Sequence, residues 1–305
     1  MDIHQIEYIV RLADTKSLTK TADEMFISLS ALSLRLSKLE DELGTPLFKR
    51  IKNEWPLTEA GRIYVEAARH TVKLFKQVKK QISDITACEA GVINIGLTTI
   101  KSSQMFAKIF SKFKERFPNI VLKVTNGITK DINLLIEQGI LDIAFVTSGY
   151  ENTGLASQLL LRERFVLSVP KTHPLAGSAK KAQRGKLSVI DLRLLENETF
   201  ILSSPELTTS LVTDKMFNEA GFTPNVLFRV SAAVLYTLVD AGCGISIIPI
   251  GNMNEKGDSV YFITDPSGYV DNLVVYPNTT RLSRAEEYYI ALAKEFIDTE
   301  YSYLH

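Results

Sequence analysis

The stretch SLTKTADEMFISLSALSLRLSKLEDELGTPLFKR, residues 17–50, predicts two short amphipathic helices joined by a tight turn. In the second helix, leucines recur at helical spacing and form one apolar stripe: Leu32, Leu36, Leu39 and Leu43. Hydroxyl groups that can cap the two helices come from Ser17 or Thr19 and from Ser28 or Ser30. Gly44, followed by Pro46, ends the second helix. The spacing fits a DNA-binding helix-turn-helix and an ordinary helical hairpin of a protein core equally well.

The outward side of the second helix carries short polar side chains. At about 100° per residue, Ser30, Leu34 and Ser37 lie opposite the leucine stripe, and Ser33 lies at the flank. Short polar side chains at the start of such a helix can approach base edges in the major groove. Ser30 and Ser33 are therefore candidates for direct contact with bases.

Residue identities extend this pattern into a family signature. The runs S-L-T-K-T-A, S-L-S-A-L-S-L-R-L, L-E-D-E-L-G-T-P-L-F-K-R and, at residues 57–61, L-T-E-A-G follow the order found in LysR-type transcriptional regulators. The chain resembles that family along essentially its whole length. The resemblance implies a homo-oligomeric, ligand-responsive transcription factor. Such a protein binds double-stranded DNA through a winged helix-turn-helix and contacts RNA polymerase if it is an activator.

Two positions depart from residues that the family commonly uses to contact bases. Leu29 stands where Gln is common, and Leu34 stands where Arg is common. Leu34 fits contact with a thymine methyl group, and it fits a protein contact or a solvent-facing position equally well. Arg35, one step around the helix, can replace the missing guanidinium or reach a phosphate. The candidate DNA-binding residues are Thr19, Lys20, Ser28, Ser30, Ser33, Leu34, Arg35, Lys49, Arg50 and Lys52.

Residues 47–58 predict a two-stranded ribbon, the wing, with its turn at Asn53 and Glu54. The family is often basic at that turn, so we expect fewer phosphate contacts and a shallower salt dependence of DNA binding. Trp55 and Pro56 are expected to pack the returning strand. Basic residues outnumber acidic ones between residues 49 and 80, although the whole chain has 35 of each.

Residues 59–86 predict one long helix, since Gly61 alone interrupts a run without proline or glycine. Its residues follow a heptad seam of Tyr64, Ala67, Thr71, Leu74, Val78 and Ile85, which Phe75 and Ile82 widen. A solitary helix of this length would leave the seam in water, so a partner helix is implied. In the family, such a helix joins the two domains and dimerises the DNA-binding heads.

Strands and helices alternate after residue 90, which predicts βαβ units on parallel sheets. Predicted strands lie at residues 92–97, 120–125, 141–146, 165–170, 200–203, 226–230, 245–249 and 273–276. Predicted helices lie at residues 102–117, 129–138, 207–220, 231–241 and 283–303. The resemblance implies that the last elements return to the first subdomain. The result would be a two-lobed α/β module resembling type II periplasmic binding proteins, hinged near residues 162 and 267.

The fold class expected for the whole chain is α+β multidomain. We expect a winged helix-turn-helix DNA-binding domain at residues 1–58 and a linker and dimerisation helix at residues 59–88. The effector-binding domain is expected at residues 89–305. Its lobe 1 would cover about 89–162 and 267–305, and its lobe 2 about 163–266.

Length and composition suit two or three soluble domains, with 305 residues of which 45% are hydrophobic and 23% charged. No run approaches the roughly 18 apolar residues of a membrane span. The first residues lack the basic start and the cleavage site of a signal peptide. We therefore expect a cytoplasmic protein with no membrane partner.

Sequence motifs for catalysis or metal binding do not appear. Cys88 and Cys243 lie too far apart to suggest a disulfide framework or a metal cluster, and the chain has only 4 histidines. No G-x-S-x-G, Walker A, H-E-x-x-H or strand-anchored G-x-G-x-x-G motif occurs. We expect no catalytic residue, no metal site and no cofactor.

Hydroxyl groups gather where predicted strands end, which is where clefts of α/β modules bind ligands. Helix starts at these places also offer free N–H groups to an anion. The candidate effector-binding residues are Thr98, Thr99, Lys101, Ser102, Thr129, Thr147, Ser203 and Ser204, which match effector-contact positions of the family. Each hydroxyl, taken alone, also fits a simple helix cap.

The charge of these candidates indicates the class of effector. Lys101 is the only nearby cation among them. Family members that bind dicarboxylates can be basic where Thr147 stands. The neutral threonine favours a less charged ligand or a small inorganic or monocarboxylate anion.

Two other functions fit parts of the sequence. A small-molecule binding protein with a degenerate DNA-binding head would explain Leu29, Leu34 and Asn53. An α/β enzyme would need the nucleophile and the base that the sequence lacks. The choices between activator and repressor, and between homodimer and homotetramer, both stay open.

Overall fold

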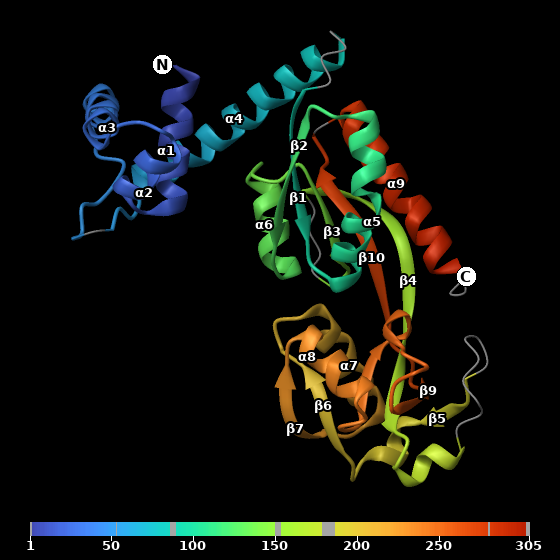
Figure 1. Cartoon of the computed structure of the whole chain (residues 1–305). Helices are drawn as coiled ribbons and strands as arrows, with labels where there is room; N and C mark the ends of the chain where they lie inside the picture. Colours follow the sequence, from blue (N-terminus) through green and yellow to red (C-terminus); the bar gives the residue numbers. More distant parts are fainter. Residues whose placement is uncertain are drawn as a thin grey trace. The chain divides into compact units, whose positions relative to one another are not determined.

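A computed structural model of the chain divides into two compact units, residues 1–88 and 89–305 (Figure 1). The structure describes residues 2–52, 54–85, 90–149, 154–178, 187–279 and 281–302. Asn53, at the predicted turn of the wing, and Cys88 lie outside the described residues. The division of the first unit at residue 58 and the lobe boundaries within the second stay predictions.

Three helices open the first unit: α1 (Ile3–Thr15), α2 (Leu18–Glu24) and α3 (Leu29–Leu43). Of the candidate caps, Ser17 begins α2 by accepting a hydrogen bond from the N–H of Lys20. Ser28 begins α3 in the same way, with the N–H of Ala31 as donor. Gly44 ends α3 with φ at 66°, a left-handed conformation that glycine adopts at little steric cost. The predicted helix-turn-helix is confirmed.

The core of the head consists of three leucines of α3 packed against α1. Leu32, Leu36 and Leu39 join Ile9 and Leu12 in one buried cluster. The sequence predicts a fourth member of the stripe, Leu43, but its side chain is 44% exposed. Leu43 is the last residue of α3, directly before the cap Gly44. The buried stripe is therefore one turn shorter than predicted.

The predicted wing forms an antiparallel ribbon with bridges between Phe48 and Leu57 and between Ile51 and Glu54. Trp55 packs against Phe48 with ring centroids 6.5 Å apart, as predicted for a residue of the returning strand. The N–H of Trp55 donates to the carbonyl of Lys16 at 3.0 Å. This hydrogen bond ties the ribbon to the end of α1.

Helix α4 (Glu59–Ile85) follows the wing and packs on α1. A Cβ at Gly61 would lie 1.9 Å from the carbonyl oxygen of Leu47, so the first turn of α4 requires glycine. Val65 belongs to the core of the head. Farther along, the side chains of Leu74 and Val78 are 61% and 43% exposed. Within one chain, this part of the predicted heptad seam faces solvent.

A mixed sheet runs through the second unit in the order β2-β1-β3-β10-β4-β9-β5, with β8 also paired to β4. Its strands are β1 (Gly91–Leu97), β2 (Ile120–Asn126), β3 (Ile143–Thr147), β4 (Leu155–Pro170), β5 (Val189–Asp191), β8 (Ser246–Pro249), β9 (Ser259–Asp265) and β10 (Tyr269–Pro277). Strand β1 is parallel to β2 and β3, whereas β10 is antiparallel to β3 and β4. The last strand therefore returns to the first part of the sheet, as the family resemblance implied.

Helices cover both faces of this first part of the sheet (Figure 1). On one face, α5 (Ile100–Arg116) and α9 (Arg284–Glu300) pack together, and the rings of Phe113 and Tyr289 meet with centroids 5.4 Å apart. On the other face, α6 (Thr129–Glu137) packs Ile132 and Ile136 against β3. Alternate residues of β3 belong to the two cores, as the period of a strand requires.

Strand β4 joins the two halves of the second unit. Residues 155–164 pair with β10, and residues 165–170 pair with β8 and β9. The sequence predicted only the second segment, because Arg162, Glu163 and Arg164 interrupt the apolar pattern of the first. Strands β5 and β9 are present in the structure but were not predicted from the sequence.

The second half of this unit adds a parallel pair, β6 (Thr199–Ser203) and β7 (Asn225–Val230). Two helices accompany it, α7 (Thr208–Ala220) and α8 (Ala232–Asp240), and three 3-10 helices cover Pro174–Ser178, Leu192–Leu195 and Ile250–Asn252. Phe217 of α7 packs edge-on against Phe200 of β6, with centroids 5.0 Å apart. This contact packs the last turns of α7 against β6.

Candidate functional sites

The candidate DNA-binding surface begins with the outward sides of α2 and α3. Thr19 and Lys20 are exposed on α2, and Ser30 is exposed in the first turn of α3. Leu34, one turn later, is 57% exposed, and Ser33 at the flank is partly buried. The predicted residues of the helix-turn-helix thus reach the surface together, while the oxygen of Ser28 is used as the cap of α3.

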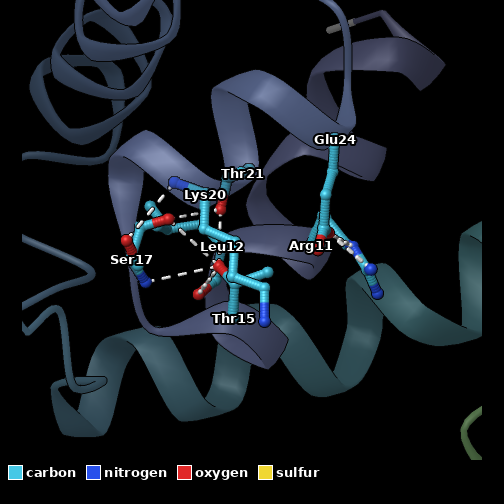
Figure 2. A network of polar contacts seen from close by, with 7 residues as sticks. All are labelled: Arg11, Leu12, Thr15, Ser17, Lys20, Thr21 and Glu24. Carbon is cyan, nitrogen blue, oxygen red and sulfur yellow. Dashed lines mark hydrogen bonds and ion pairs between the residues drawn. The ribbon is translucent and has the colours of Figure 1, made fainter.

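A network of hydroxyl groups fixes the joint between α1 and α2 (Figure 2). The hydroxyl oxygens of Thr15 and Thr21 lie 2.6 Å apart, and the Thr21 hydroxyl donates to the carbonyl of Ser17 at 2.8 Å. Thr21 is fully buried, and a buried hydroxyl without a partner would cost about 1–3 kcal/mol. Arg11 and Glu24 pair across the same joint at 2.5 Å. These side chains, which the sequence analysis did not single out, hold α2 in place.

Two arginines of the candidate surface stack on aromatic rings. The guanidinium carbon of Arg35 lies 5.3 Å from the ring centroid of Tyr8 in α1, and that of Arg50 lies 5.2 Å from Trp55. Stacking holds a guanidinium in one orientation and leaves its edge available for a phosphate. Lys49 and Lys52 are exposed on the ribbon beside Arg50. The predicted basic residues of the wing therefore lie on its surface.

A cavity of about 110 Å³ lies in the second unit, between its two halves. Five of the eight predicted effector residues line it: Thr98, Thr99, Lys101, Thr129 and Thr147. Ser102 is instead buried in the cap of α5, where its hydroxyl donates to the carbonyl of Thr99 at 2.8 Å. Ser203 and Ser204 also lie outside the lining. The hydroxyl of Ser203 accepts a hydrogen bond from Thr209 at 3.0 Å.

Other residues of the lining were missed by the sequence analysis. The second half contributes Leu207, Thr208, Thr209, Ala232, Tyr236, Pro249 and Asn252, and the connecting strands contribute Glu163, Val270 and Asn272. Thr208 and Thr209 begin α7, so attention to helix starts as well as strand ends would have found them. Tyr236 lies one turn inside α8 and gives no comparable signal in the sequence.

Three buried threonines meet across the cavity. The hydroxyl oxygens of Thr129 and Thr147 lie 3.3 Å apart, and Thr147 also contacts the hydroxyl of Thr208. Thr129 begins α6 and Thr147 ends β3, whereas Thr208 begins α7 in the other half. The two halves of the unit therefore touch through hydroxyl groups that can donate and accept hydrogen bonds.

The cation predicted for this site is already paired. Lys101 forms an ion pair with Glu163, and their side chains are only 7% and 2% exposed. Burial lowers the pKa of the Lys101 ammonium, and the negative charge of Glu163 opposes that shift. Glu163 also accepts hydrogen bonds from the N–H of Gly251 at 3.1 Å and from the Nδ2 of Asn272 at 2.7 Å. Lys101 lines the cavity as predicted, but its charge is neutralised there.

Four helix starts supply further polar groups to the lining. Thr99 is the N-cap of α5, and Thr129, Thr208 and Ala232 are the first residues of α6, α7 and α8. The caps of α6 and α7, Ile128 and Leu207, make no side-chain hydrogen bond to the helix. The first N–H groups of a helix cannot bond within it, so these two starts offer backbone donors at the lining of the cavity. The arrangement suits oxygen atoms of a small ligand.

Comparison with known proteins matches each of the two units to a family model. The model described as "Bacterial regulatory helix-turn-helix protein, lysR family" matches residues 3–62, and the "LysR substrate binding domain" matches residues 87–296. A helix-turn-helix joined to a ligand-binding module defines the class of ligand-responsive regulators of transcription. Within that class, the chain belongs to the LysR family and is a DNA-binding transcriptional regulator.

Similar proteins extend over most of the chain. The HTH-type transcriptional regulator CfxR of Cupriavidus necator is 27% identical over 311 residues, which cover 99% of this chain and 95% of CfxR. The uncharacterized HTH-type transcriptional regulator YybE of Bacillus subtilis is 27% identical over 250 residues, 82% of each chain. No helix in the described part of the chain combines the length and the apolar character needed to cross a membrane.

Solved structures share the fold. A full-length OxyR variant from Pseudomonas aeruginosa has a TM-score of 0.69 at 19% identity and covers 98% of this chain and 95% of its own. The LysR family transcriptional regulator CbnR has a TM-score of 0.57 at 16% identity, with 97% and 99% coverage. At these identities the likeness concerns the fold alone.

Proposed function

We propose that the cavity of the second unit binds a small polar effector that carries at most one negative charge. The ion pair between Lys101 and Glu163 carries this proposal, because it neutralises the one cation of the described lining. A dicarboxylate would have to give up the hydration of two charges without a free cation to offset either loss. An uncharged or monoanionic ligand needs only the hydroxyl groups and the helix starts.

The effector acts on DNA binding through the assembly of subunits. The exposed Leu74 and Val78 of α4 favour pairing with a second copy, as a homodimer or homotetramer. CbnR, a protein of the same fold, has been solved in complex with its target DNA. An effector that binds two assembly states with different affinity shifts the equilibrium between them and so repositions the DNA-binding heads.

The remaining features follow from this role. The protein acts on double-stranded DNA in the cytoplasm and contacts RNA polymerase if it is an activator. We assign it no catalytic activity, since CfxR and YybE, which resemble it, are named as regulators of transcription. The function predicts a sequence-selective gel shift with the DNA upstream of its own gene or of the adjacent operon. Equal binding to unrelated DNA of the same length would contradict it.

A thermal-melting screen of the full chain tests the effector class. Butyrate, butanamide and succinate serve as matched probes within a wider set of metabolites, because saturating ligand stabilises the folded state. We expect the stabilising compounds to be uncharged or monoanionic. Thr147→Val should abolish their effect, whereas Thr237→Val, at an exposed threonine of α8, should not. Stabilisation by dianions or by cations would contradict the assignment.

A further inference from the structure

The outward face of α3 has an unusual composition in its first turns. At about 100° per residue, Ser30, Leu34 and Ser37 lie opposite the buried leucines, with Ser33 at the flank. Among residues 29–37, Leu34 is the one large side chain on this side of the helix, and Lys38 and Asp41 extend the same side toward the end of α3. With 57% of its surface exposed, Leu34 projects beyond its shorter neighbours.

Two polar side chains near Leu34 make contacts within the head. The hydroxyl of Ser30 lies 3.1 Å from that of Ser28, which caps α3. The guanidinium of Arg35 lies over the ring of Tyr8 in α1. The methyl groups of Leu34 are exposed beside these two side chains and can contact a base in front of this face.

Charge on α3 is arranged against its helix dipole. Acidic side chains stabilise the first turn of a helix, yet α3 has none there and carries Glu40, Asp41 and Glu42 at its other end. This distribution keeps negative charge away from the N-terminal end. Such an end can approach the phosphates of DNA without repulsion.

We propose that Leu34 determines operator specificity by packing on the C5-methyl group of a thymine in the major groove. Thymine is the only base that presents a methyl group there, so an apolar side chain can select it without a hydrogen bond. The inference rests on the DNA-binding function of the chain and adds the base that this helix selects. Each half-site of the operator then carries thymine at one fixed position.

Deoxyuridine provides a direct test, because it pairs like thymine and lacks only the methyl group. Duplexes that bind the full-length protein are first selected from a random library, and each thymine of the selected site is then replaced singly by deoxyuridine. We expect affinity to fall about fourfold at one position of each half-site. This is the change in affinity expected when the burial of one methyl-sized group is lost. Leu34→Ser should bind the thymine and deoxyuridine duplexes equally at that position.

Leu43→Ser is the matched control, since Leu43 is 44% exposed at the far end of the same helix. This variant should keep the discrimination of the parent. A parent protein that ignores every deoxyuridine overturns the inference, and so does a Leu34→Ser variant that still discriminates. A selection that enriches no sequence is a different failure. It overturns sequence-selective DNA binding itself and favours a small-molecule binding protein with a degenerate head.

Discussion

At the scale of single residues, Glu163 connects several elements of the effector-binding unit, although no pattern in the sequence singled it out. Its carboxylate lies on β4 and accepts hydrogen bonds from Gly251, after β8, and from Asn272 on β10. It also pairs with Lys101 at the start of α5. A buried charge is tolerated only when it is paired, so these elements depend on one another.

Removing either charge should therefore be costly. Glu163→Gln leaves the ammonium of Lys101 buried without a counter-charge, and we expect a loss of about 3 kcal/mol in the free energy of unfolding. Lys101→Met in the same chain removes that orphaned charge, so the double variant should be more stable than Glu163→Gln alone. Urea unfolding measures both. Strictly additive losses would mean that the two groups do not stabilise each other.

The buried hydroxyl of Tyr289 should make the stability of the protein depend on pH under alkaline conditions. Tyr289 is fully buried between Phe113 and Phe145, and burial raises the pKa of its hydroxyl well above the usual value of 10.0. The unfolded chain loses this proton first as pH rises. The stability that Tyr289 contributes is therefore fully present below about pH 10 and is lost above it.

Tyr289→Phe should reduce this alkaline loss, which for one group amounts to roughly 1.4 kcal/mol per pH unit. At neutral pH the variant should be at least as stable as the parent, because no hydrogen-bond partner of the Tyr289 hydroxyl is found among the described residues. Urea unfolding at about pH 8 and pH 11 compares the two proteins. Tyr269→Phe, at an exposed tyrosine, should leave the loss unchanged. An unaltered pH profile in Tyr289→Phe would contradict the assignment.

At the scale of elements, the sequence predicts those parts whose signal is local. Leucine spacing and the caps Ser17 and Ser28 suffice for α2 and α3, because each signal acts within one or two turns. The first half of β4 could not be predicted in this way. Glu163 looks like a surface residue in the sequence, and only its distant partners make a buried position possible. Because these partners are distant in the sequence, Glu163 was also not predicted as a residue of the candidate site.

We expect basic side chains of the wing to contribute to the salt dependence of DNA binding. Lys49 is exposed on its first strand, and each phosphate that a basic side chain neutralises contributes about 0.9 to the slope of log affinity against log salt. Lys49→Gln should reduce the steepness of that slope by about one. Gel-shift titrations between low and moderate salt measure it. Lys123→Gln, on β2 of the other unit, should change nothing, and an equal effect of both variants would exclude a specific role of the wing.

At the scale of the whole molecule, the discontinuous second unit could be predicted only from the family resemblance. Strand β10 returns to β3 after more than a hundred intervening residues, and no local pattern in the chain specifies that pairing. The cavity could not be predicted from local patterns either, because residues far apart in the sequence line it. Thr147 could be named from its strand, but its contact with Thr208 joins two halves whose closeness the sequence does not encode locally.

Pairing of two copies through α4 should control how tightly the protein holds DNA. Leu74 and Val78 are exposed in one chain, and their spacing fits a seam against a second helix. Leu74→Glu places a charge in that seam and should shift the protein toward monomers in analytical ultracentrifugation. A monomer engages one half-site at a time, so operator affinity should fall by about a hundredfold or more.

Leu194→Glu serves as the control, because Leu194 is 71% exposed in a 3-10 helix of the second unit. It introduces the same charge and should leave both assembly and operator affinity unchanged. If Leu74→Glu stays assembled and binds as the parent does, then α4 is not the element that joins the copies. If it becomes monomeric yet keeps full affinity, a single head suffices for DNA binding, and an effector cannot act by repositioning two of them.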